Sequence, residues 1–186
     1  MKKIGIIGLG NMGSKMVINL LKAGYEVIGY DINKKLIDQL MPKGLKGISN
    51  LSEIPNNIDV VITMLPNGEI VEKVYENIIN RFKPNTLLTD CSTIDVNAAK
   101  DLHKKCNDKN LLSLDAPVSG GVGGAESGTL TFMVGGNNKA YKLMLPLFKA
   151  MGKKSVLCGP ASAGQAAKAC NNMLLATTMI GVGEAF

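Results

Sequence analysis

The hexapeptide Gly8-Leu9-Gly10-Asn11-Met12-Gly13 has residue types and spacing that suit dinucleotide binding. It separates a short apolar run, residues 3–8, from a helical pattern over residues 12–22. In a G-x-G-x-x-G turn the first glycine permits the tight turn, the second admits the pyrophosphate, and the third brings helix and strand together. The helix N-terminus adds amide donors and a favourable dipole. We expect all six residues to contact the cofactor, although a glycine-rich turn without a ligand is the alternative for the hexapeptide alone.

A carboxylate follows at the position that this motif requires. Asp31 ends the predicted strand over residues 26–30, 18 residues after Gly13. There it would accept hydrogen bonds from the ribose hydroxyls and repel a 2′-phosphate, which favours NAD over NADP. Lys34 and Lys35 lie close by in the sequence and leave NADP open.

Lys168 is the candidate proton acceptor. It is the only charged residue between Gly159 and Glu184, in a segment that reads as an apolar helix. A desolvated lysine shifts towards neutrality and can act as a base. Asn172 lies four residues later, on the same helix face, at about 6 Å. A lysine that reaches solvent near a helix start is the alternative from composition alone.

His103, the single histidine, is the other residue type suited to proton transfer. Its neighbours Asp101, Lys104 and Lys105 place it on the polar side of a predicted helix. We therefore expect a solvated surface histidine.

Strands and helices alternate along most of the chain. Strands are expected over residues 3–8, 26–30, 60–64, 86–90, 111–116 and 131–134, and helices over 12–22, 34–41, 70–82, 94–106 and 138–151. A glycine-rich loop lies before the last strand, and Pro146 should break or kink the last helix. The pattern predicts an α/β fold with a doubly wound, mainly parallel (Rossmann) sheet.

From residue 163 the pattern changes to one long helix, apolar nearly all round, without a stop signal before Phe186. Such a helix should be covered on every side. We expect a dinucleotide-binding domain over residues 1–162, and over residues 163–186 the start of a linking helix whose following domain is missing.

Composition narrows the remaining possibilities. The net charge is +6, but the lysine pairs are dispersed, which argues against a nucleic-acid-binding face. The four cysteines have no zinc spacing, so we expect reduced thiols and no metal. No signal peptide or membrane span is evident. These features predict an intracellular protein, in the mitochondrial matrix of a eukaryote and otherwise in the cytoplasm.

Two later segments, Asp115-Ala-Pro-Val-Ser-Gly-Gly-Val-Gly-Gly-Ala and Gly164-Gln-Ala-Ala-Lys-Ala-Cys-Asn-Asn, resemble the β-hydroxyacid dehydrogenases, above all those that oxidise 3-hydroxyisobutyrate. Thr63-Met-Leu-Pro and Cys91-Ser-Thr-Ile-Asp extend the resemblance. It implies a Rossmann domain, a linking helix and an all-helical domain that forms a homodimer or higher oligomer.

The resemblance also implies site residues. Cofactor contacts would come from Met64, Leu65, Pro66 and Thr93, and the substrate carboxylate would bind to Ser119, Gly120 and Gly121. Lys168 and Asn172 would bind substrate and carry the catalysis, a role that Asn171 could share.

The activity implied is the NAD-dependent oxidation of 3-hydroxyisobutyrate to methylmalonate semialdehyde, as in valine breakdown. NADH-linked reduction of tartronate semialdehyde or another short-chain semialdehyde acid uses similar motifs. A non-catalytic dinucleotide-binding fragment is the alternative of another class, and it would have no need of Lys168, Asn172 or Ser119.

Overall fold

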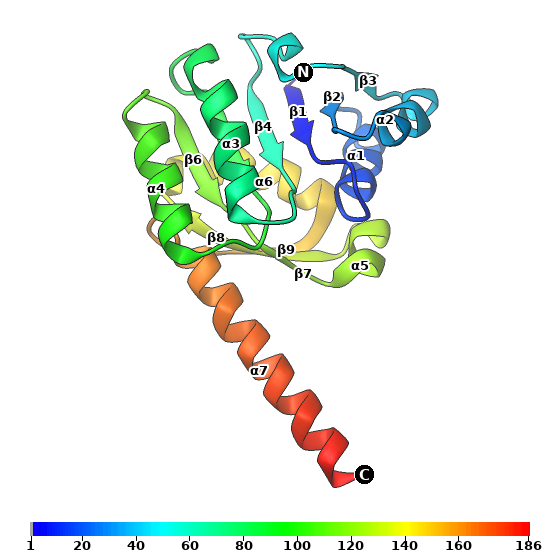
Figure 1. Ribbon diagram of the computed structural model, residues 1–186, viewed down its shortest axis with the longest axis vertical. Coiled ribbons are helices and arrows are strands. Elements are labelled where there is room, and N and C mark those ends of the chain that lie inside the picture. Colours follow the sequence, from blue (N-terminus) through cyan, green and yellow to red (C-terminus); the bar gives the residue numbers. More distant parts are fainter. Residues whose placement is uncertain (1) are drawn as a thin grey trace.

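The computed structural model describes residues 2–186, which form a nine-stranded sheet with helices on both faces (Figure 1). The strands are β1 (Lys3–Ile7), β2 (Glu26–Tyr30), β3 (Lys46–Gly47), β4 (Val60–Thr63), β5 (Leu87–Asp90), β6 (Leu112–Asp115), β7 (Val118–Ser119), β8 (Leu130–Gly136) and β9 (Gly152–Gly159). The helices are α1 (Gly13–Lys22), α2 (Lys34–Leu40), α3 (Gly68–Ile78), α4 (Val96–Asn107), α5 (Gly121–Ser127), α6 (Asn138–Met151) and α7 (Ala163–Ala185).

The strand order confirms the predicted doubly wound sheet. Strands β3-β2-β1-β4-β5-β6 are all parallel, whereas β8 runs antiparallel to β6 and β7 and parallel to β9. The order reverses between β1 and β4, and ligands of open parallel sheets bind beyond the strand C-termini at such a point. In Figure 1 the arrows of β1 and β4 point towards the side from which α7 projects. The expected cofactor edge and α7 therefore share one side of the domain.

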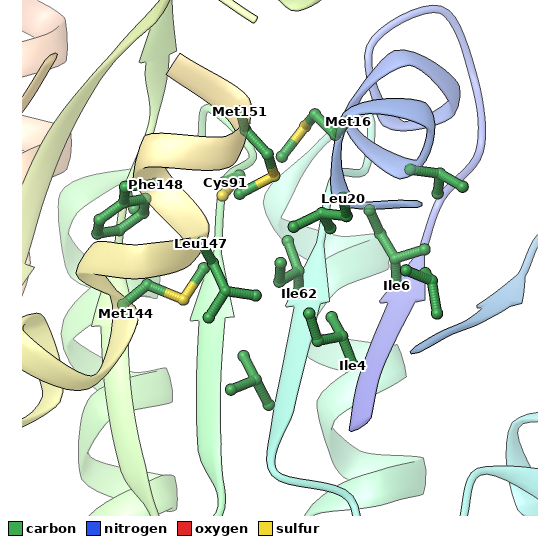
Figure 2. Close-up of a cluster of buried hydrophobic side chains, with 14 of the residues drawn as sticks. Ile4, Ile6, Met16, Leu20, Ile62, Cys91, Met144, Leu147, Phe148 and Met151 are labelled. Carbon is green, nitrogen blue, oxygen red and sulfur yellow. The ribbon is translucent and has the colours of Figure 1, made fainter. Parts of the chain in front are cut away.

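The central parallel strands β1, β4 and β5 are buried on both faces, as their continuous apolar runs predict. On one face Ile4, Ile6 and Ile62 pack against α1 and α6, with Met16, Met144 and Met151 between them (Figure 2). On the other face the core includes buried side chains of β4, β5, α3 and α4. In a chain without tryptophan, flexible methionines fill the irregular gaps.

Several elements differ from the predictions. Strand β9 was not expected, because its polar residues 153–155 precede its apolar residues 156–158 without alternation and its pairing with β8 is non-local. The predicted glycine loop contains β7 and the short helix α5. Helix α6 continues through Pro146 rather than breaking there, and buried Leu147, Phe148 and Met151 anchor the turn that follows.

Helix α7 is one continuous helix, as predicted. Only its first turns pack on the domain, and every side chain from Ala169 onward is exposed. The sequence predicted a helix that is covered on every side, but no other element within residues 2–186 covers this part of α7. In the same part of the chain, no helix combines the length and apolarity needed to cross a lipid bilayer.

Candidate functional site

The glycine turn after β1 has the backbone that an anion site requires. Gly8 has a φ of +95°, and a Cβ there would collide with the Met64 carbonyl, while a Cβ at Gly13 would collide with the Gly8 carbonyl. A Cβ at Gly10 would meet nothing within 4 Å. Helix α1 begins at Gly13, and its N-cap residue Met12 provides no side-chain cap, so no side chain caps the end of the helix at which a phosphate would bind. These features fit a pyrophosphate bound over Gly10.

The main chain orients Asp31 towards this turn. The Leu9 N–H donates to Asp31 Oδ2 at 2.7 Å, and the Asn33 N–H donates to Oδ1 at 2.8 Å. Since the half-buried carboxylate has accepting capacity left, it can also bind ribose hydroxyls.

A cavity of about 350 Å³ brings most of the predicted cofactor residues together. Its lining includes Gly8, Gly10, Asn11, Met12, Gly13, Asp31, Met64, Leu65 and Pro66. Leu9 is not among them, because its side chain is 0% exposed in the core and its amide is engaged by Asp31. Thr93 is exposed on the neighbouring loop, outside this cavity.

The cavity also has an apolar rim that sequence reasoning missed. Ile32 is 92% exposed, and together with Ile70 and Val74 it lines one part of the wall. Such a surface suits a flat base such as adenine. The one signal in the sequence for this rim was Ile32, an apolar residue that directly follows Asp31 and does not pack into the core.

A buried carboxylate joins the two loops that follow β4 and β5. Asp90 Oδ1 accepts from Thr63 Oγ1 at 2.7 Å and from Ser92 Oγ at 2.6 Å, and Ser92 Oγ accepts from the Leu65 N–H at 2.9 Å. Burial raises the pKa of Asp90, although the hydrogen bonds from Ser92 and Thr63 oppose this effect. The network fixes Leu65 and the residues around Thr93 relative to each other.

The prediction for His103 was wrong. Its side chain is only 11% exposed and lies between Ser113 and Asp115. Nε2 donates to Asp115 Oδ1 at 2.9 Å, since a carboxylate only accepts, and Nδ1 lies 2.7 Å from Ser113 Oγ. Polar sequence neighbours did not reveal this, because β6 supplies both partners across the helix–sheet contact.

Asp115 also holds the start of α7. Its Oδ1 accepts from the Ser162 N–H at 2.8 Å and its Oδ2 from the Gln165 N–H at 2.9 Å. Ser162 has a φ of +69° and offers no side-chain cap, so this remote carboxylate serves as the cap of α7. A negative charge at a helix N-terminus is also favoured by the helix dipole.

The predicted catalytic residues lie on α7 beyond this anchor. Lys168 is half-buried, and burial lowers its pKa. Asn171 and Asn172 are exposed on the next turn. The three carboxylate-binding candidates are elsewhere, with Ser119 at the end of β7 and Gly120 and Gly121 at the start of α5. Both glycines have positive φ, at +125° and +60°. Figure 1 shows β7 and α5 on the side of the domain from which α7 projects.

Comparison with known proteins gives consistent similarities. Residues 3–159 match the profile described as the NAD binding domain of 6-phosphogluconate dehydrogenase. The chain is 48% identical to mitochondrial 3-hydroxyisobutyrate dehydrogenase of Drosophila melanogaster, over 99% of this chain and 57% of that protein. It is 45% identical to NAD-dependent L-serine dehydrogenase of Pseudomonas aeruginosa, over 100% of this chain and 63% of that protein.

A solved structure shares the fold closely. Mycobacterium tuberculosis 3-hydroxyisobutyrate dehydrogenase with L-serine matches with a TM-score of 0.97 and 44% identity, over 100% of this chain and 64% of that one. The chain thus spans about 57–64% of the length of these three proteins.

Proposed function

Because the chain belongs to the family of the NAD binding domain of 6-phosphogluconate dehydrogenase, we propose that it works in the NAD-dependent oxidation of a small β-hydroxyacid. The substrate we propose is 3-hydroxyisobutyrate, with methylmalonate semialdehyde as product, as in valine breakdown. The observation that carries this proposal is a pair of hydrogen bonds from Gln165 of α7 to Ser92 and Ile94. They fix the helix that bears Lys168 against the loop that bears Thr93. Relatives named 3-hydroxyisobutyrate dehydrogenase, at 44–48% identity, support the choice of substrate.

The residues divide into a cofactor set and a substrate set. The turn from Gly8 to Gly13 binds the pyrophosphate, Asp31 binds the ribose, and the β4 loop at Leu65 and Pro66 continues the site towards Thr93. When bound, NAD supplies the hydride acceptor. On the substrate side, backbone amides at Gly120 and Gly121 and the Ser119 hydroxyl bind the carboxylate, since an anion can approach glycine amides closely.

Lys168 accepts the hydroxyl proton in this scheme. Partial burial lowers its pKa, so more of the amine is neutral at a given pH than in a fully solvated lysine. Asn172 lies one turn later on the same helix face and hydrogen-bonds the substrate or the lysine. A neutral amine next to the hydroxyl is the form that can take the proton.

L-serine is the second candidate substrate. One relative is named NAD-dependent L-serine dehydrogenase, and the matching Mycobacterium structure is described with L-serine. Both compounds place a primary hydroxyl on the carbon β to a carboxylate, and they differ in a methyl against an ammonium group at the carbon between them. The same carboxylate and proton contacts would therefore serve either substrate.

A substrate panel tests the proposal. The protein is assayed with NAD and NADP against 3-hydroxyisobutyrate and L-serine, and with NADH against tartronate semialdehyde. We expect the highest kcat/KM for 3-hydroxyisobutyrate with NAD. A higher value for L-serine would select the second candidate, and binding of NAD without turnover of any hydroxyacid would contradict an enzymatic role.

We further propose that residues 1–162 form the dinucleotide-binding unit and that residues 163–186 begin a helix linking it to an oligomerisation region. The exposed apolar side chains of α7 support this organisation. Mitochondrial relatives in Drosophila melanogaster and Dictyostelium discoideum support a mitochondrial matrix location in a eukaryote, with the cytoplasm as the location otherwise.

A further inference from the structure

Gln165 connects the first turn of α7 to both sides of Thr93. Its Nε2 donates to the Ser92 carbonyl at 2.8 Å, and its Oε1 accepts from the Ile94 N–H at 3.2 Å. The side chain is buried, and the residue is 2% exposed. Gln165 thus brackets the loop position that is proposed to contact the cofactor.

The backbone of Gln165 is fixed as firmly as its side chain. Its N–H donates to Asp115 Oδ2, and a Cβ on the adjacent Gly164 would collide with the Met133 carbonyl and lie 2.8 Å from Asp115 Oδ2. Ser162 keeps a left-handed backbone there, and the surrounding contacts must offset the strain of that conformation. The first turn of α7 therefore has one well-defined position on the sheet.

Helix geometry extends this constraint to the proposed base. Lys168 and Asn172 follow Gln165 by three and seven residues, and residues with these spacings share one helix face. The face that meets the Thr93 loop is therefore the face from which Lys168 and Asn172 extend.

We infer that Gln165 is a positioning residue that sets Lys168 relative to the cofactor loop at Thr93. This inference rests on the proposed function, because it takes Lys168 as the proton acceptor. Displacement of a reacting group by about 1 Å can cost on the order of 10²-fold in rate. Loss of the Gln165 side-chain contacts should act through Lys168, rather than through the cofactor cavity around Gly8, Gly10 and Asp31.

A double-mutant cycle on the intact protein tests this role. Gln165→Met keeps the side-chain length and removes both hydrogen bonds, and we expect kcat to fall on the order of 10²-fold with NAD affinity changed less than about threefold. In the Lys168→Ala background the same change should cost less than about threefold, because residues that act together are not additive. With substrate that carries deuterium at the hydroxyl-bearing carbon, the kinetic isotope effect on kcat should be larger in the single variant Gln165→Met than in the wild type. The same change in the Lys168→Ala background should not increase it further.

Two further variants control the cycle. Tyr141→Phe removes a comparable hydrogen bond, from Tyr141 Oη to the Ser155 carbonyl at 3.0 Å, between α6 and β9, and should leave kcat and the isotope effect unchanged. If Gln165→Met does not fold, Gln165→Glu keeps the acceptor for the Ile94 N–H but places an oxygen against the Ser92 carbonyl, and it should give a loss of the same kind.

The outcomes separate the inference from the proposed function. Additive costs in the double variant, or normal turnover in Gln165→Met beside an inactive Lys168→Ala, would overturn the positioning role alone. Normal turnover in Lys168→Ala would overturn the proposed base, and the positioning inference with it.

Discussion

Lys168 is the residue on which the proposed chemistry depends. Lys168→Ala should reduce turnover by about 10²–10⁴-fold, the usual range for loss of a general base, with NAD affinity nearly unchanged because the turn from Gly8 to Gly13 is intact. Steady-state kinetics and calorimetric NAD titration check both expectations. Exposed Lys104→Ala is the matched control and should keep wild-type turnover.

The pH profile gives a separate check on Lys168. Because burial lowers its pKa, activity in the oxidative direction should rise with pH and level off below the pH at which an ordinary lysine becomes neutral, about 10.4. Lys168→Arg keeps a cation that does not deprotonate, so it should lose both activity and this rise. Full activity in Lys168→Ala or Lys168→Arg would require another proton acceptor.

At the residue scale, Asp31 is the residue that we propose to determine the choice of cofactor. Its carboxylate would lie against a 2′-phosphate, so the wild-type protein should bind NAD several-fold more tightly than NADP, and Asp31→Ala should remove that gap. Calorimetry with each dinucleotide measures the ratio. Asp38→Ala removes an exposed carboxylate on α2 and should preserve the preference. Equal affinities in the unmutated protein would contradict the role of Asp31.

At the scale of elements, the packing of α7 on the sheet depends on the close approach that Gly164 permits rather than on helix propensity. Alanine normally favours a helix over glycine by about 1 kcal/mol, yet Gly164→Ala would drive a Cβ into the Met133 carbonyl. We expect a net loss of about 1–3 kcal/mol in the free energy of unfolding, a typical cost of overpacking.

Gly181 offers a matched control on the same helix, because a Cβ there would meet nothing within 4 Å. Gly181→Ala should leave the melting temperature unchanged or raise it. Thermal unfolding followed by circular dichroism compares the two variants. An equal effect of both substitutions would show that close packing at Gly164 does not decide how α7 is seated.

At the scale of the whole molecule, α7 presents a long apolar surface to solvent. Met173, Leu174, Met179 and Ile180 are each 66–68% exposed. Contiguous apolar surface of this kind usually marks an interaction site, so the 186-residue chain should self-associate with increasing concentration. Light scattering coupled to size exclusion measures this. Leu174→Lys with Ile180→Lys should shift the population towards monomer, whereas a monomeric wild type at high concentration would contradict the expectation.

Patterns local in the chain were sufficient to predict the parallel sheet, the glycine turn, the position of Asp31 directly after β2 and the single helix from residue 163. Each depends on neighbours within a few residues, through apolar periodicity or backbone freedom at glycine. The bounds of β2 agree with the prediction at both ends.

Tertiary structure decided the features that join distant segments. His103 reads as a surface residue from its neighbours, yet β6 buries it beside Asp115. Strand β9 forms because β8 is available as its partner, and Gln165 gains its side-chain hydrogen bonds only when α7 meets the β5 loop. In each case a polar group is satisfied by a partner far away in the sequence. Composition and periodicity carry no signal of such a pairing, because the hydrogen bond exists only after the elements have packed.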